Sequence, residues 1–184
     1  MKNVKSYGTT IPHGIPVGIG IDQSLTGFAM SAVKVSDPTV HETWVYKSPF
    51  RGVKRLQDIY SILHQFIEIH SWVDVAMEGT VLASHSALVL GELSATVKLC
   101  LYNEFTHAPL QIPPMTLKKF ASGKGNSKKQ EMLLQIYKRY GVEFLDDNAA
   151  DAFGLARIAA GVAISDVERG IIEQVEDEKY RDSV

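Results

Sequence analysis

The chain has 184 residues, of which 45% are hydrophobic and 22% are charged, and its formal net charge is −2. This composition is ordinary for a globular domain and argues against a disordered chain, a collagen-like repeat or a bulk polycation. The single cysteine, Cys100, excludes an internal disulfide and a cysteine-based zinc cage. It lies in an apolar stretch, so we expect a buried structural thiol.

The N-terminal residues show no secretory signal. Residues 1–16 mix Lys, His, Gly and Pro without a continuous apolar run, which predicts an irregular lead-in. No apolar run elsewhere approaches the about 20 residues of a membrane-spanning helix. We therefore expect a cytoplasmic protein with no membrane partner.

The hydrophobic pattern predicts strands and helices from residue 17 to residue 163. Apolar runs of strand length come first, and longer segments with apolar residues at helical spacing follow. In chain order the pattern predicts strands at 17–21, 28–35 and 40–47, a helix at 53–70, a strand at 73–77, a helix at 86–105, a strand at 110–112, and helices at 116–121, 127–140 and 147–163.

This order of elements predicts a mixed α/β sheet with helices on both faces. Three closely connected strands favour an antiparallel meander, and the two strand–helix units that follow add parallel strands. Right-handed crossovers place the fourth predicted strand beside the first. We assign a five-stranded ribonuclease H-like domain to residues 17–163, and residues 164–184 to an acidic C-terminal helix or tail.

Charge is segregated along the C-terminal half of the chain. From Lys118 to Arg139 there are seven basic residues and one acid, whereas from Ser165 onward there are seven acids and three bases. The pattern fits two solvated surface faces. It also fits a nucleic-acid-binding stretch followed by an acidic tail.

Three acids occupy positions that the predicted sheet brings together. Asp22 ends the first apolar strand, Glu78 follows the fourth, and Asp151 lies in the first turns of the last apolar helix. Grouped carboxylates repel one another unless a cation intervenes, and Mg²⁺ prefers such oxygen ligands. Two such ions can activate water and stabilise the leaving oxygen of a phosphodiester. The cluster therefore predicts metal-assisted hydrolysis.

Each acid also has a structural alternative. Asp22 can begin a turn, Glu78 can be a solvated strand end, and Asp146 or Asp147 can cap the last helix. The stretch from Asp22 to Gly27 also looks like the first phosphate loop of actin-like ATPases. Those proteins use two such domains, for which this chain is too short, so no nucleotide cofactor is expected.

Several ordered segments resemble the RuvC-type Holliday junction resolvases. Residues 20–29 resemble the opening strand and turn of the family, and Glu78 matches an acid that follows a strand. Residues 86–92 resemble the start of a long helix, residues 114–129 a basic loop that contains glycine, and residues 149–152 an Ala-Ala-Asp helix start. The resemblance covers about residues 17–162. It implies a ribonuclease H-like fold and a crossover junction endodeoxyribonuclease, and the departures from the cellular enzymes look like those of a bacteriophage member.

The resemblance implies a metal site. Asp22, Glu78 and Asp151 match the metal-binding acids of the family, which would hold two Mg²⁺ ions, with Mn²⁺ as a substitute. The family has a further acid three residues before the last one, where this chain has Asn148, preceded by Asp147. We favour Asp147 as the fourth ligand because it shares a helix face with Asp151, and Asn148 stays open as a neutral ligand.

The resemblance also implies where DNA is bound. Lys118 and Lys129 match family positions near the scissile phosphate, where positive charge neutralises developing negative charge. Polar residues around the glycine loop are expected to contact the DNA backbone, namely Lys119, Lys124, Asn126 and Lys128. The short segment from Val81 to His85 lacks the aromatic residues that the family carries near the junction centre. We expect His85 to be a surface residue at a helix start.

The expected partner is four-way or other branched DNA, cut symmetrically by a homodimer. The helix at 86–105 is the candidate interface, although packing within the monomer explains it equally well. Two alternatives stay open for the function. One is a broader debranching nuclease that also acts on structured RNA, and the other is a catalytically silent junction-binding protein, which Asn148 favours.

Overall fold

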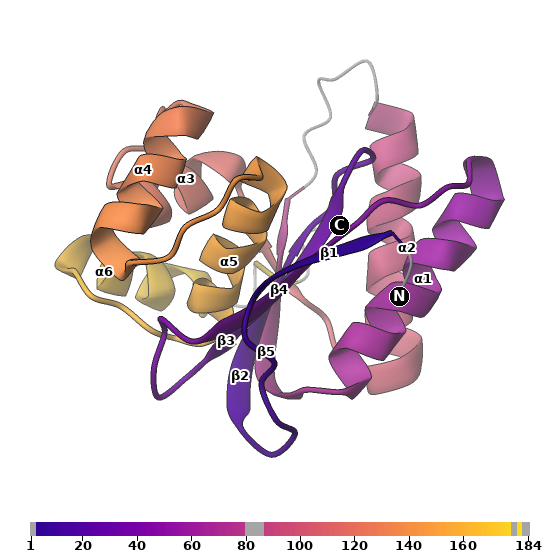
Figure 1. Cartoon of the computed structure of the whole chain (residues 1–184), viewed down its shortest axis with the longest axis horizontal. Coiled ribbons are helices and arrows are strands. Elements are labelled where there is room, and N and C mark those ends of the chain that lie inside the picture. Colours follow the sequence, from indigo (N-terminus) through magenta and orange to yellow (C-terminus); the bar gives the residue numbers. More distant parts are fainter. Residues whose placement is uncertain (1–2, 80–86, 178–179, 182–184) are drawn as a thin grey trace.

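The computed structural model of the chain describes residues 3–79, 87–177 and 180–181. In this part of the chain a mixed six-stranded sheet lies between two groups of helices (Figure 1). The predicted segment from Val81 to His85 lies outside the described residues. Among the helices that are described, none has the length and apolar character needed to cross a membrane.

The strand order of the sheet is β1-β4-β3-β2-β5-β6. The antiparallel meander is made of β2, β3 and β4, and β5 and β6 continue the sheet as parallel strands. Because β5 pairs with β2, the predicted neighbourhood of the two acid-bearing strands is confirmed. The strands cover Val4–Gly8 (β1), Pro16–Asp22 (β2), Phe28–Lys34 (β3), His41–Tyr46 (β4), Ser71–Glu78 (β5) and Leu110–Ile112 (β6).

The prediction of five strands is wrong, because part of the supposed irregular lead-in joins the sheet as β1. This strand pairs antiparallel with β4, from Val4 opposite Tyr46 to Gly8 opposite Glu42. None of its residues is buried, and it forms one edge of the sheet. A strand exposed in this way lacks the apolar alternation by which half-buried strands are recognised in a sequence.

Helices cover both faces of the sheet in the described part of the chain. The pair α1 and α2 packs on one face, and α5 packs on the other with α3, α4 and α6 around it (Figure 1). The helices cover Gly52–Glu68 (α1), Ala87–Phe105 (α2), Pro114–Ser122 (α3), Lys129–Tyr140 (α4), Asp147–Ala159 (α5) and Asp166–Val175 (α6).

Two predicted helix ends are wrong. The fourth predicted helix does not start at residue 127, where the Ser127 hydroxyl lies 2.6 Å from the Ser122 hydroxyl and donates to the Lys124 carbonyl. The helix therefore begins later, at Lys129. The fifth helix ends at Ala159 and not at residue 163, since the chain turns through a glycine, Gly161, with φ of 68°.

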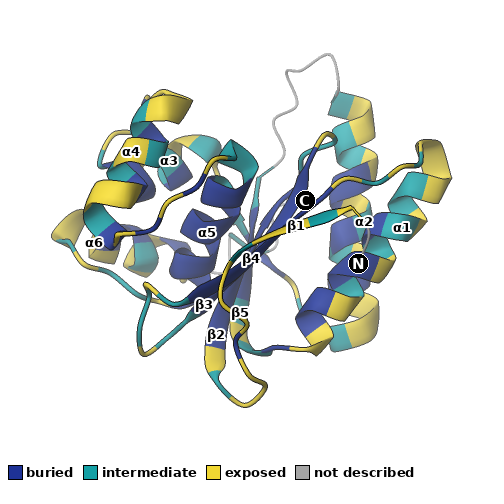
Figure 2. Ribbon diagram, viewed as in Figure 1, coloured by how far each residue is buried: buried dark blue, intermediate teal, exposed yellow. Residues whose placement is uncertain are grey.

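Alternation along β2 separates two hydrophobic cores. Val17, Ile19 and Ile21 point into the core under α1 and α2, which also contains the buried thiol predicted for Cys100. Gly18 and Gly20 point the opposite way, toward α5. A Cβ at Gly20 would lie 2.0 Å from the Ala152 carbonyl oxygen, so the α5 backbone packs directly on β2. Figure 2 shows both inner layers as buried.

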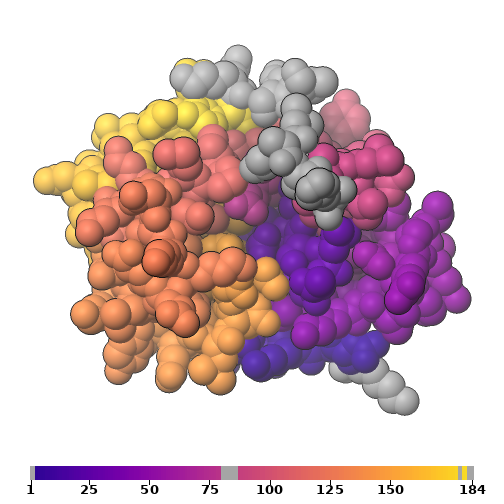
Figure 3. All heavy atoms as spheres, turned by 90° about the horizontal axis from the view of Figure 1, so that it is seen from above, coloured from indigo at the N-terminus to yellow at the C-terminus, as the bar shows by residue number. Residues whose placement is uncertain are grey.

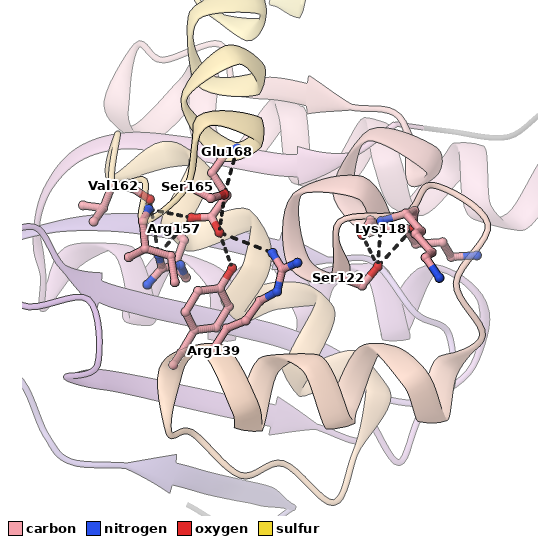
Figure 4. Close-up of polar contacts among 10 residues, drawn as sticks. Lys118, Ser122, Arg139, Arg157, Val162, Ser165 and Glu168 are labelled. Carbon is pink, nitrogen blue, oxygen red and sulfur yellow. Dashed lines mark hydrogen bonds and ion pairs between the residues drawn. The ribbon is translucent and has the colours of Figure 1, made fainter.

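The acidic C-terminal segment contains a docked helix. Ile171 and Val175 of α6 belong to the core around α5. Glu168 is 0% exposed and lies between α4 and α5, where it pairs with Arg157 (Figure 4). Of the two forms expected for the C-terminal segment, the structure shows a helix at Asp166–Val175.

Candidate active site

Strand alternation places two acids on the same face of the sheet, at the carboxyl ends of two neighbouring strands. Asp22 and Glu78 are the last residues of β2 and β5, and the parallel register pairs Ile21 with Met77 directly before them. Ile21 and Met77 point into the core under α1 and α2. Asp22 and Glu78 therefore point to the α5 face, side by side at the carboxyl ends of neighbouring parallel strands.

The start of α5 adds further polar groups at this edge. The Asp146 carboxylate caps the helix by accepting a hydrogen bond of 3.0 Å from the Asn148 backbone N–H, which settles the capping alternative for Asp146. Asp147 and Asp151 lie one turn apart on the same helix face. Because the glycines of β2 let α5 approach closely, this helix start reaches the ends of β2 and β5.

One cavity of about 410 Å³ collects all five predicted metal ligands, Asp22, Glu78, Asp147, Asn148 and Asp151. Lys118 of α3 and Lys129 of α4 line it as well. Seen from above, the orange surface of α3 and α4 borders the purple surface of the N-terminal half of the chain (Figure 3). The other predicted DNA contacts do not line the cavity and lie on exposed surface, at Lys119, Lys124, Asn126 and Lys128.

The acids of the cavity are poorly compensated. Asp22 is 5% exposed, and its burial raises its pKa well above the usual range, with a further rise from the charges of Asp151, Glu78 and Asp147. Desolvation, followed by the charges of Glu78 and Asp147, raises the pKa of Asp151 to about 7. Desolvation also raises the pKa of Glu78, against the opposing charges of Lys118 and Lys129. The cluster would therefore be stabilised by an added cation.

Asp147 and Asn148 differ in what they contact. The Lys129 ammonium donates to the Asp147 carboxylate, and this contact lowers the pKa of Asp147 and raises that of Lys129. The Asn148 amide lies over Gly27, where a Cβ would meet its Nδ2 at 2.9 Å. Asp147 is thus paired with Lys129, whereas the Asn148 side chain packs against Gly27.

No family model matches the chain, and no curated protein matches its sequence. Solved structures do match. Thermus thermophilus RuvC superposes with a TM-score of 0.60 and 20% sequence identity, over 77% of this chain and 90% of that chain. The T. thermophilus RuvC complex with a Holliday junction substrate gives a TM-score of 0.62 and 21% identity, over 78% of this chain and 91% of that chain.

The chain has the RuvC fold. The α/β architecture and mixed sheet that the resemblance implied are confirmed, with six strands in place of five. At 20–21% identity the likeness is one of fold. The chemistry of the site must therefore be argued from the residues that line its cavity.

The residues that line the cavity fit a hard divalent cation in their chemistry. Carboxylates and amide oxygens are the donors that Mg²⁺ prefers. Within the described ranges, however, no three His, Cys, Asp or Glu side chains are already grouped to hold a metal ion. Cation binding would therefore require the carboxylates to draw together.

Gln23 also lines the cavity and was not predicted as a site residue. Its side-chain oxygen Oε1 is buried, and no donor in the described part of the chain reaches it. An unsatisfied buried acceptor next to a group of acids supports the fit to a hydrated cation. The available signal in the sequence was its position directly after Asp22, at the same strand end.

Proposed function

We propose that the protein is a structure-specific endonuclease that resolves four-way DNA junctions by metal-dependent phosphodiester hydrolysis. The observation that carries this proposal is the cavity at the carboxyl ends of β2 and β5, where four acids face two lysines within a RuvC fold. The same fold in T. thermophilus RuvC has been solved with a Holliday junction substrate, which supports this substrate class.

In this proposal Asp22, Glu78 and Asp151 bind two Mg²⁺ ions, for which Mn²⁺ can substitute, and Asp147 is the fourth charged ligand. Bound ions of this kind activate water and stabilise the leaving oxygen of a phosphodiester. The protein keeps Asp22 at 5% exposure, which strengthens the attraction of the cluster for cations. Lys118 and Lys129 bind and orient the scissile phosphate at the cavity.

Exposed residues around the cavity are proposed to bind the DNA backbone. Phosphate contacts of this kind position the duplex without reading its sequence, and they make affinity strongly dependent on salt. Junction shape would then select the substrate. The residues are those of the α3–α4 surface, Lys119, Lys124, Asn126 and Lys128.

We also propose a homodimer that pairs through α2. One face of this helix is exposed at spacings of four and three residues, which is the pattern of a two-helix seam, at Leu88, Glu92, Ala95, Leu99 and Tyr102. Its large apolar side chains are open to solvent, with Leu88 80% and Tyr102 64% exposed. Such an apolar face marks an interaction surface.

The direction of α2 decides how the two copies pair. Leu90, in its first turn, lines the cavity, so α2 begins at the edge of the sheet that carries the acids (Figure 1). Parallel pairing about a two-fold axis along α2 puts both cavities on one side of the dimer, where one junction can reach them. We expect the parent to sediment as a dimer and Leu99→Glu as a monomer; a monomeric parent would contradict this interface.

The test of the function is cleavage of a labelled synthetic four-way junction in Mg²⁺ by the parent and by Asp22→Asn. Paired symmetric nicks from the parent alone are expected. Junction binding without cutting by both proteins would contradict the proposed enzyme and favour a silent junction-binding protein. Equal cutting of forks, flaps and RNA duplexes would favour the broader debranching nuclease.

A further inference from the structure

Gln23 makes a hydrogen bond that the proposed function does not yet use. The residue follows Asp22 at the end of β2, and it is 7% exposed. Its amide nitrogen Nε2 donates to the backbone carbonyl of Glu78 over 2.7 Å. This bond sets the orientation of the amide, because only the nitrogen can donate to a carbonyl.

The bond extends the pairing of β2 with β5 beyond the ladder. The parallel register ends with Ile21 opposite Met77, one residue before the two acids. The Gln23 side chain supplies the next link between the strand ends. On the opposite side, the Gly79 N–H donates to the Ile112 carbonyl of β6 over 2.8 Å. The Glu78 end of β5 is therefore held to both neighbouring strands.

The other end of the same amide has an unused acceptor. Oε1 of Gln23 is buried and meets no donor among the described residues, although the side chain lines the cavity of the acids. A buried acceptor without a donor is costly and uncommon in native proteins, and an ordered water or ion often accounts for it. An uncharged acceptor also adds no repulsion to a group of carboxylates.

We propose that Gln23 is a positioning residue of the divalent cation site. Its Nε2 holds Glu78 beside Asp22, and its Oε1 accepts a hydrogen bond from the hydration shell of the bound cation. The inference rests on the proposed function, because the proposed function assigns a cation to this cavity. It fits the chemistry of Mg²⁺, which keeps several waters when bound to proteins and depends on outer partners to orient its ligands.

The test is calorimetric titration of Mn²⁺ into the DNA-free protein. Gln23→Met keeps the length of the side chain, but its thioether cannot donate a hydrogen bond and accepts one only weakly, so we expect about 10- to 100-fold weaker binding. Gln57→Met makes the same change at an exposed position of α1 and should bind as the parent does. A purely structural role would lower the thermal midpoint of Gln23→Met without changing its Mn²⁺ affinity, and that result overturns the inference.

Gln23→Asn provides a second variant if Gln23→Met does not fold. It keeps the amide but is one methylene too short to hold Glu78 and reach the cation shell together, so weaker Mn²⁺ binding is again expected. Parent-like affinity in this variant overturns the inference. A parent that binds no Mn²⁺ overturns both the cation site and the role of Gln23, whereas a parent that binds Mn²⁺ but cuts no junction overturns only the proposed function.

Discussion

A single acid and a group of acids lie near opposite ends of α5, and their surroundings differ. Near the C-terminal end, the buried Glu168 carboxylate accepts hydrogen bonds from the Tyr140 hydroxyl at 3.1 Å and the Ile164 N–H at 2.9 Å, and pairs with Arg157 at 3.4 Å (Figure 4). At the N-terminal end, Asp22 and Asp151 lie among other carboxylates, which raise their pKa values further than desolvation alone.

The contrast separates a structural role from a binding role. A buried carboxylate with its own donors holds the surrounding elements together, and Glu168 in this way joins α6 to α4 and α5. Acids that face one another without enough donors reduce stability, and such groups concentrate at sites where a ligand binds. Each of the following experiments tests whether the two ends of α5 behave in these opposite ways.

Glu168→Ala should have the largest effect on stability. It leaves the Arg157 guanidinium, 1% exposed, without its carboxylate, and we expect a loss of about 3–5 kcal/mol in the free energy of unfolding, measured in urea. Junction cleavage per folded molecule should stay close to that of the parent. Glu173→Ala, at an exposed position of the same helix, is the control and should change neither quantity. A small loss in the free energy of unfolding would contradict a structural role for Glu168 at the C-terminal end of α5.

Asp22→Asn should show the reverse pattern. Removing one charge from the cluster should lower the cleavage rate by about 1,000-fold while leaving the free energy of unfolding at pH 8 equal or higher. Cleavage assays and urea denaturation of the same preparations measure both. If Asp22→Asn loses stability as Glu168→Ala does, Asp22 is a structural acid and the contrast between the two ends fails.

Lys129→Ala should lower cleavage by about 100-fold, because it removes a positive charge that lines the cavity. The side chain is 75% exposed, so the thermal midpoint should change little. Lys138→Ala removes an exposed lysine from the same helix and is the matched control. Equal cleavage by Lys129→Ala and the parent would remove this residue from the mechanism.

The contribution of Asp151 to the stability of the cation-free protein should fall as pH rises from about 4 to about 7. The pKa of Asp151 is about 7 in the folded protein, against an ordinary value of 3.8, so between these values the folded state binds more protons than the unfolded state. This contribution must then decrease with pH across the window, whereas His41, whose burial lowers its pKa to about 4, contributes in the opposite direction. Thermal midpoints of the parent and of Asp151→Asn at pH 5 and pH 8 separate the two contributions, and the variant should exceed the parent by more at pH 8 than at pH 5. An equal difference at both pH values would contradict the raised pKa of Asp151.

The smallest effect is expected from the pair that competes for the fourth ligand position. Asp147→Asn should reduce cleavage by about 10-fold, and Asn148→Ala should reduce it less. Both side chains line the cavity, so cleavage rates at saturating and limiting Mg²⁺ distinguish their roles. A larger effect in Asn148→Ala would make the amide, and not Asp147, the fourth ligand.

Much of the sheet could be predicted because its strands are buried and short connections join them. The elements from β2 to β5 follow from local apolar spacing, and the crossover rule correctly placed β5 beside β2. The edge strand β1 could not be predicted in this way, since its pairing with β4 depends on backbone hydrogen bonds and not on buried side chains. The docking of α6 likewise depends on partners in other helices, such as Tyr140.

Local apolar runs put Asp22 and Glu78 at strand ends, and the crossover rule made those strands neighbours. The side-chain period of a strand, which is a local property, then put both acids on the same face. Whether each acid has donors around it does not depend on the local sequence. Glu168 belongs to the acidic C-terminal segment, and it became structural because Arg157 and Tyr140 converge on it from α5 and α4. Asp22 remained uncompensated because Gly18 and Gly20 bring α5, with Asp151 at its start, against β2. The distance from an acid to its donors depends on how helices pack, and residues far apart along the chain set that packing.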